Sequence, residues 1–166
     1  MFICAGARAP AQTFGPPIQG FCLLSRTGAI NASRAGQAMQ VQLRQMQASL
    51  SGALAQQRAA LDAQRRALEA RQNVTAPIEY QRQQAALNQQ AQALDQQQNA
   101  RFVAAQQRGQ QQIDRALNDA LGRVVTRSSC SLVLERDNAY GWNNGMDITP
   151  AVTHEMDSLL QNIVLQ

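Results

Sequence analysis

The sequence contains no lysine, only one histidine and few aromatic residues. Aromatic side chains account for 4% of the 166 residues and charged side chains for 16%, whereas glutamine and alanine fill most of positions 35 to 125. Because glutamine and alanine bury little apolar area per residue, a stretch this long cannot form a compact globular core. Both residues favour helices, so we expect long helices in this region.

Long hydrophobic runs are also missing. No stretch approaches the roughly 18 consecutive apolar residues that a membrane-spanning helix needs. A short apolar run at residues 2–5 leads into Ala9-Pro10-Ala11, which is similar to a signal-peptide cleavage site, but a basic n-region and a longer apolar stretch are absent. We interpret residues 1–17 as a leader or flexible N-terminal tail, whose signal is either truncated or not clearly recognisable.

Residues suited to catalysis or metal binding are equally sparse. His154-Glu155 lacks a second histidine four residues on, so the zinc-protease pattern is absent. The sequence has no glycine-rich phosphate loop, and Cys22 and Cys130 do not make the tight cluster that a zinc site needs. We therefore predict that the protein is not an enzyme and uses no metal and no cofactor.

The cysteines allow two interpretations. If export removes the segment that holds Cys4, Cys22 and Cys130 remain as a pair, each within a β-like run. In an oxidising compartment they are a candidate disulfide. Two buried free thiols are the alternative.

The positive charge is concentrated in the helical region and comes from arginine alone. Residues 34–127 hold twelve arginines against six acidic residues, whereas the rest of the chain holds three against five. A basic helical region suits an anionic partner, such as a lipid headgroup, an acidic unfolded chain or nucleic acid. Ordinary solvation of a helix face explains the same charges equally well.

Residues 34–127 are predicted to form a helical hairpin with its tip near residues 73–77. The helical pattern breaks there because Pro77 lacks a backbone donor and suits only the first turn of a new helix. When partner numbers are required to sum to 148, leucines of the two arms pair, for example Leu61 with Leu87, and the register centres on Val74 within the break. This register predicts an antiparallel coiled coil.

The seam of this coiled coil is predicted to be weak. Alanine and glutamine occupy many positions where leucine would pack better. Gly52, Gly109 and Gly122 each cost about 1 kcal/mol relative to alanine in a helix interior. We therefore expect arms that bend.

The two ends of the chain are predicted to form one small body. Residues 18–33 contain the first strand and the start of the helix, with a short apolar run at residues 21–24. Residues 128–166 contain a strand at 131–135, a third strand near 139–142 and a final helix that Thr149 caps. The hairpin brings the chain back to its start, so the end strands can meet.

This order of elements resembles the Skp (OmpH) family of periplasmic chaperones. Residues 132–140 (Leu-Val-Leu-Glu-Arg-Asp-Asn-Ala-Tyr) and 147–152 (Asp-Ile-Thr-Pro-Ala-Val) are similar to the family's strand, turn and D-[IL]-T-x-x-[VI] helix start. Residues 21–25 resemble its first strand. The resemblance covers roughly residues 18–164, although the glutamine-rich arms align only by their period.

The resemblance implies a mainly α fold with a small β body, in which a long antiparallel coiled-coil hairpin is inserted between strands of a trimerisation domain. It implies an ATP-independent periplasmic holdase, a homotrimer that binds unfolded outer-membrane β-barrel proteins in a cavity between its helical arms and prevents their aggregation. Many family members bind lipopolysaccharide, so anionic lipid or lipopolysaccharide is a further implied partner, although the absence of lysine departs from the family's usual arms.

Two groups of residues are the candidates for these roles. Client-binding candidates are arginines and apolar residues near the tip, whose alternative role is ordinary solubility: Arg58, Arg65, Arg66, Arg71, Val74, Ile78, Tyr80 and Arg82. Candidates for the trimer interface or the body core are apolar residues of the end segments: Leu23, Leu24, Leu132, Val133, Leu134, Ile148 and Val152.

Two other function classes remain open. A structural coiled-coil adaptor of an envelope secretion or efflux assembly would use similar arms, but it predicts a tip motif and flanking barrel domains that the sequence does not show. A nucleic-acid-binding coiled coil is permitted by the basic arms, but few aromatic residues and no clustered arginines support it, and we expect no nucleic acid partner.

Overall fold

The computed structural model describes residues 14–165, which divide into two compact units. Residues 14–37 and 112–163 form one unit, here called the body. Residues 38–111, with Val164 and Leu165, form the other, here called the arm. The chain is mostly helical with one small sheet, which confirms the predicted fold class. Among these residues, no helix is both long enough and apolar enough to cross a membrane.

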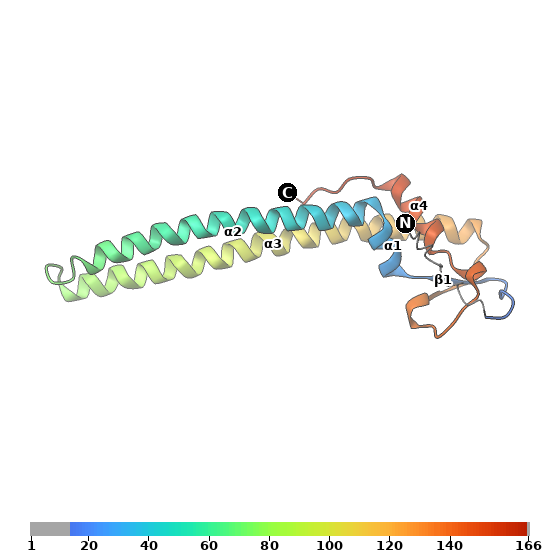
Figure 1. Ribbon diagram of the computed structural model, residues 1–166, viewed down its shortest axis with the longest axis horizontal. Helices are drawn as coiled ribbons and strands as arrows, with labels where there is room; N and C mark the ends of the chain where they lie inside the picture. The colour runs from blue at the N-terminus through green and yellow to red at the C-terminus, as the bar shows by residue number, and fades with distance from the viewer. Residues whose placement is uncertain (1–13, 166) are drawn as a thin grey trace, which may run out of the picture. The chain divides into compact units, whose positions relative to one another are not determined.

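Two long antiparallel helices make the hairpin. Helix α2 spans Arg34–Glu69 and helix α3 spans Pro77–Arg127, with a turn between them (Figure 1). Pro77 occupies the first position of α3, and Glu79 lies in its first turn, where a negative charge favours the positive end of the helix. Helix α2 begins at Arg34 and α3 ends at Arg127, where the helical pattern begins and ends, whereas α2 ends at Glu69, before the break predicted near residues 73–77.

The seam of the arm is shallow. Leu61, Leu68, Ala105, Met39 and Gln98 are buried, but many other seam residues, among them Leu54 and Leu94, are only half-buried. Met39 packs beside Gly109, and their numbers sum to 148, as the predicted register requires. The arm therefore keeps the expected register with little fully buried side-chain area.

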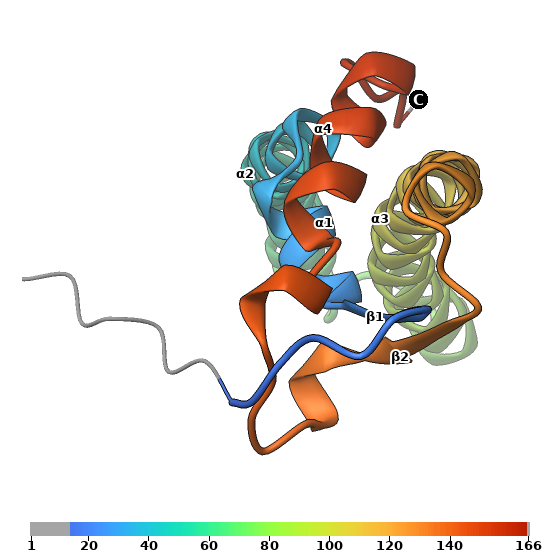
Figure 2. The ribbon, with the colours of Figure 1, turned by 90° about the vertical axis from the view of Figure 1, so that its right-hand side faces the viewer.

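The sheet of the body has two parallel strands. β1 spans Phe21–Leu24 and β2 spans Leu132–Glu135, and the two strands lie side by side (Figure 2). In the register of the pair Phe21 is opposite Leu132. Parallel strands need a long crossover connection, and the whole helical hairpin supplies it here. Leu23 also bridges to Asp147.

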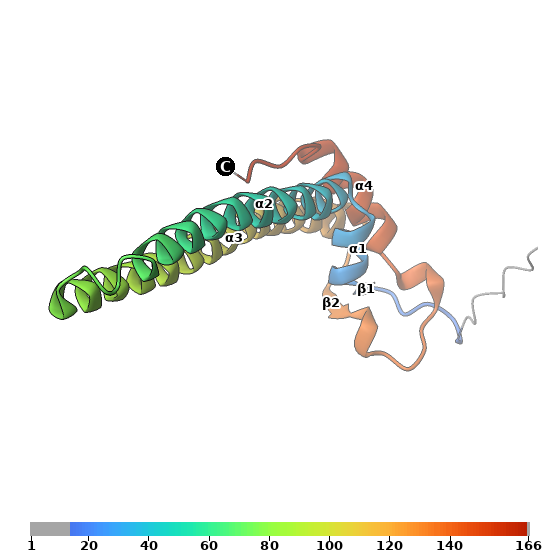
Figure 3. The ribbon, with the colours of Figure 1, turned by 60° about the vertical axis from the view of Figure 1, so that its left-hand side comes forward.

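Two short helices cover this sheet region, and one of them was not predicted. Helix α1 spans Arg26–Ala32 and contacts α4, which spans Thr149–Leu159 (Figure 3). The sequence predicts only the start of the long helix in this part of residues 18–33. The signal for α1 was Ser25, whose hydroxyl accepts a hydrogen bond from the backbone N–H of Gly28 as an N-cap.

Two predictions for the C-terminal part were wrong. Residues 139–142 do not form a third strand; short 3-10 turns at Arg136–Asn138 and Asn144–Met146 flank them instead. The side chains of Glu135 and Asn143 accept backbone N–H groups and so favour turns over a strand. The hydroxyl of Thr149 does not cap α4 either, because Asp147 accepts the backbone N–H of Thr149 and provides this contact.

Candidate interaction surfaces

The strands of the body leave an apolar surface uncovered. Phe21, Leu132 and Leu134 lie on one face of the sheet, as their register and alternation require. Leu132 is 43% exposed and Leu134 is 47% exposed. Within the described chain, β2 pairs with β1 alone, so its other edge is open. We call Phe21, Leu132 and Leu134 the open sheet face.

The candidates for interface and core separate into two groups. Leu23, Leu24, Ile148 and Val152 are buried inside the body. Val133 is half-buried, and Leu132 and Leu134 are exposed on the open sheet face. The first group packs within the subunit, so only the second group has side-chain area left for a partner.

A polar network joins the end of β1 to the start of α4. The backbone N–H of Ser25 donates to Thr149 Oγ1 at 2.9 Å, and its hydroxyl donates to Asp137 Oδ2 at 2.7 Å. Arg136 Nη1 donates to Asp147 Oδ2 at 2.8 Å, and the N–H of Thr149 donates to Asp147 Oδ1 at 2.9 Å. The two contacts of Ser25 join segments more than 100 residues apart in sequence.

The charges in this network stabilise one another. Burial alone would raise the pKa of Asp147, but hydrogen bonds from Thr149 and Arg136 outweigh burial and hold the pKa below its ordinary value. The hydrogen bond to Asp147 is the main reason that the pKa of Arg136 is raised. Arg136 also lies 5.4 Å from the centre of the Trp142 ring. The network therefore depends on Asp147 staying ionised.

A second charge cluster ties α4 to the last turns of α3. Arg127 and Arg123 both donate to the carboxylate of Glu155, the latter at 3.0 Å. These hydrogen bonds, that of Arg127 first, lower the pKa of Glu155. Two of the arginines counted in the basic helical region are therefore occupied by a structural partner.

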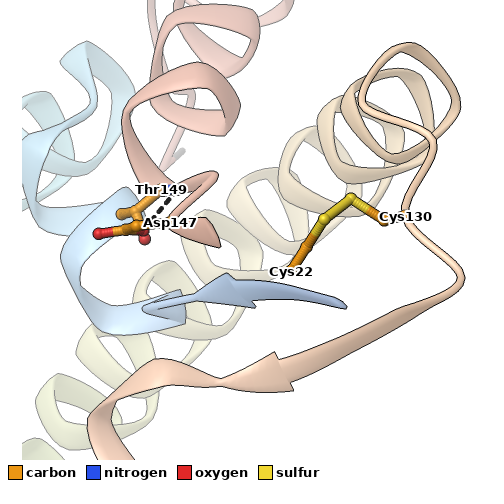
Figure 4. The surroundings of a disulfide bond; sticks show 4 residues. All are labelled: Cys22, Cys130, Asp147 and Thr149. Carbon is orange, nitrogen blue, oxygen red and sulfur yellow. Dashed lines mark hydrogen bonds between the residues drawn. A yellow bond between two sulfur atoms is a disulfide. The ribbon is translucent and has the colours of Figure 1, made fainter. Parts of the chain in front are cut away.

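The cysteine pair is bonded. Cys22 of β1 and Cys130, which lies just before β2, form a disulfide with their Cα atoms 5.8 Å apart (Figure 4). The bond encloses the whole hairpin, since its ends are 108 residues apart. Closing a loop of this length restricts the unfolded chain and stabilises the fold by about 4–5 kcal/mol in the chain-entropy account.

The arginine candidates of the arm mostly have partners within the arm. Arg58 pairs with Asp95 across the seam at 2.7 Å, and Arg65 donates to Asn88 Oδ1 at 3.0 Å. Arg71, in the turn after α2, donates to the backbone carbonyl of Ala67, and Arg82 lies 3.6 Å from Glu79. Such exposed pairs contribute little stability, so the arginines can exchange these partners for others at small cost.

The apolar candidates of the arm lie at its tip. Val74 in the turn is 84% exposed, and Ile78 in the first turn of α3 is 75% exposed. Tyr80 is half-buried against the seam. Val74 and Ile78 form a small apolar surface that nothing in the described chain covers.

Comparison with known proteins identifies the family of this chain. The family model described as "Outer membrane protein (OmpH-like)" matches residues 21–156, which span both strands, the hairpin and most of α4. The chain belongs to the OmpH-like family. This result confirms the resemblance seen in the sequence.

The OmpH-like fold is also found in a solved structure. A proposed OmpH-like outer membrane chaperone from Caulobacter crescentus CB15 superposes with a TM-score of 0.77 and 27% sequence identity, covering 92% of each chain. No match was found among curated proteins. The family and the fold support a chaperone role.

Sequence reasoning missed two features of this OmpH-like chain. The network joins Ser25 to Asp137 and Arg136, which lie more than 100 residues later in the sequence, so no local sequence pattern predicts it. The packing of Leu165 against Gly109 was missed for the same reason: a β-carbon at Gly109 would lie 2.8 Å from Leu165 Cδ2. Gly109 had been counted only as a weak point of the helix.

Proposed function

We propose that this OmpH-like protein is an ATP-independent periplasmic holdase. It binds unfolded outer-membrane β-barrel proteins in a cavity between the arms of a homotrimer and so prevents their aggregation. The observation that carries the proposal is the open sheet face: the described residues leave Phe21, Leu132 and Leu134 40–47% exposed, and none of them pairs with the outer edge of β2.

The open sheet face supports assembly. An exposed apolar strand with a free edge is an aggregation hazard unless another chain covers it. The body is too small to hide more strands by itself, so we expect copies of the chain to share this surface. Three copies are what the family resemblance implies.

The arm suits loose binding at many points. A holdase works by mass action, because it binds the unfolded client and not the folded one. The exposed arginines attract acidic segments, and Val74 and Ile78 offer small apolar contacts. Several arms acting together raise the total affinity although each contact is weak.

The disulfide supports export. A bond between Cys22 and Cys130 persists in an oxidising compartment such as the periplasm and is rare in the cytosol. The segment that was interpreted as a leader, residues 1–17, lies almost entirely outside the described residues. Periplasmic location therefore rests on the disulfide together with the family.

Anionic lipid or lipopolysaccharide is a second proposed partner. The arm holds eight arginines against four acidic residues. A net positive surface of this kind attracts anionic headgroups at low ionic strength. Dependence of vesicle binding on the fraction of anionic lipid would test this partner separately from client binding.

Light scattering tests the main proposal. The purified chain is expected to form a trimer and to suppress aggregation of an unfolded β-barrel protein. Replacing the five candidates Arg58, Arg65, Arg66, Arg71 and Arg82 by glutamine is expected to weaken client capture several-fold at low salt, because long-range attraction is lost. A monomer that fails to suppress aggregation would contradict the proposal and favour the adaptor alternative.

A further inference from the structure

The seam of the arm opens into a cavity at mid-length. Its volume is about 200 Å³, and its walls include Leu50 and Leu54 of α2 and Gln98 and Phe102 of α3. In the hairpin register Gln98 faces Leu50, at a position where a coiled coil normally places leucine. The cavity is therefore located where a polar residue interrupts the apolar seam.

Gln98 has an unmet hydrogen-bonding requirement. It is only 8% exposed, and its Oε1 is the one buried side-chain polar atom in residues 14–165 that lacks a partner. A buried acceptor without a donor retains the full cost of losing water. Turning the amide towards a donor in the adjoining cavity would remove that cost.

The cavity limits what that donor can be. Its volume is several times the roughly 30 Å³ that a liquid water molecule occupies, so the cavity has room for a side chain. Its lining is mixed: Leu50, Leu54 and Phe102 are apolar, and Gln47, Ser51, Gln98 and Asn99 are polar. An occupant that combines an apolar body with a hydrogen-bond donor matches both the apolar residues and the acceptor of Gln98. Among side chains, tyrosine and tryptophan have this combination.

We propose that this cavity binds a donor-bearing aromatic side chain, tyrosine or tryptophan, of an unfolded client. The ring packs on Leu50, Leu54 and Phe102, and its O–H or N–H donates to Gln98 Oε1. The inference rests on the proposed holdase function, since outer-membrane β-barrels carry girdles of aromatic residues at both membrane interfaces. The cavity site would give the arm a preference for particular client residues in addition to its attraction for acidic segments.

Small molecules that copy the two side chains test the site directly. In NMR titrations of the full chain, p-cresol and 3-methylindole are expected to shift the Gln98 side-chain amide and the Leu50 and Leu54 methyl signals. Toluene, which has no donor, is expected to bind roughly 3- to 10-fold more weakly, as loss of one hydrogen bond implies. Equal binding of toluene and p-cresol would overturn the proposal.

Substitutions locate the effect. Gln98→Met keeps the length of the side chain and removes the acceptor, and Gln98→Leu restores a normal seam residue, which keeps the helices folded. Both are expected to weaken p-cresol binding to the level of toluene. Gln97→Leu is the matched control, because Gln97 is an exposed neighbour on the same helix, and it is expected to leave binding unchanged. Unchanged p-cresol binding in both Gln98 variants would contradict the role of Gln98.

A client experiment separates this inference from the holdase proposal. Two clients are compared: an unfolded β-barrel protein, and a variant of that client in which every tyrosine and tryptophan is changed to phenylalanine. The wild-type chain is expected to capture the unchanged client better than the variant. The Gln98→Met chain is expected to capture both clients equally. Equal capture of both clients by the wild-type chain would refute the aromatic preference and leave the holdase standing. Failure to suppress aggregation with intact p-cresol binding would refute the holdase and leave the cavity site.

Discussion

In the body, the large apolar side chains of α3 and α4 are almost fully buried, whereas in the arm most seam residues stay half-exposed. Ile113, Leu117 and Met156 of the body are almost fully buried, whereas Leu54 and Leu94 of the arm are half-exposed. The body adds a disulfide and two charge networks, while the arm relies on exposed ion pairs. The difference shows that one chain can combine a tightly packed unit with a loosely packed one.

Removing the disulfide is expected to have the largest effect on the difference between body and arm. Replacing Cys22 and Cys130 by serine is expected to lower the free energy of unfolding of the body by about 4–5 kcal/mol, because the closed loop of the unfolded chain is released. Helicity of the arm by circular dichroism at low temperature is expected to change little. Cys4→Ser is the chemical control. Equal thermal stability with and without a reducing agent would show that the bond contributes nothing.

Leucine truncation compares the two units directly. Leu117→Ala in the body is expected to cost about 3 kcal/mol, since Leu117 is almost fully buried. Leu94→Ala in the arm is expected to cost about 1 kcal/mol, because that side chain is already half-exposed. Denaturant melts of both variants measure the difference, and equal losses would contradict the contrast in packing.

Acid is expected to weaken the body through Asp147. Its pKa is lowered in the folded protein, so its stabilising contribution is fully present above the unfolded pKa of about 3.9 and is lost as pH falls through the lower folded pKa. Asp147→Asn is expected to lower the free energy of unfolding by about 1–2 kcal/mol at pH 7. It is also expected to reduce the loss of stability that the wild-type protein shows as the pH falls. Urea melts from pH 7 to 3 measure it, and parallel curves for both proteins would refute this role.

Two glycines of the arm give the smallest and sharpest comparison. Gly52→Ala is expected to stabilise the arm by about 1 kcal/mol, because a β-carbon there meets nothing within 4 Å. Gly109→Ala is expected to gain less or to destabilise, since its β-carbon would lie 2.8 Å from Leu165 Cδ2. Thermal melts compare the pair. An equal gain at both positions would show that Leu165 does not depend on Gly109.

Local patterns predicted the elements that depend on neighbours in sequence. The composition predicts the helices, Pro77 predicts the start of α3, and short apolar runs predict both strands. The family was inferred from the short segments at the two ends of the chain, and the family model over residues 21–156 confirms the family.

Long-range contacts accounted for the errors. The third strand expected near residues 139–142 is absent because hydrogen bonds of neighbouring side chains favour turns there. Asp147 rather than the hydroxyl of Thr149 supplies the N-terminal contact of α4, and Arg136 holds that carboxylate in place. Leucine at positions 23 and 134 looked equivalent, yet only Leu23 is buried, because the chain at Asp147 and Ile148 lies beside β1.

The sequence by itself determined the two long helices, the tip of the hairpin, the weak seam and the family, since periodicity, proline and short motifs act over a few residues. Only the tertiary structure decided that Cys22 meets Cys130, that Leu132 and Leu134 remain uncovered, that Gly109 makes room for Leu165, and that Gln98 lies beside a cavity. Each of these depends on which distant segment fills the space next to a side chain, and local sequence does not contain that information.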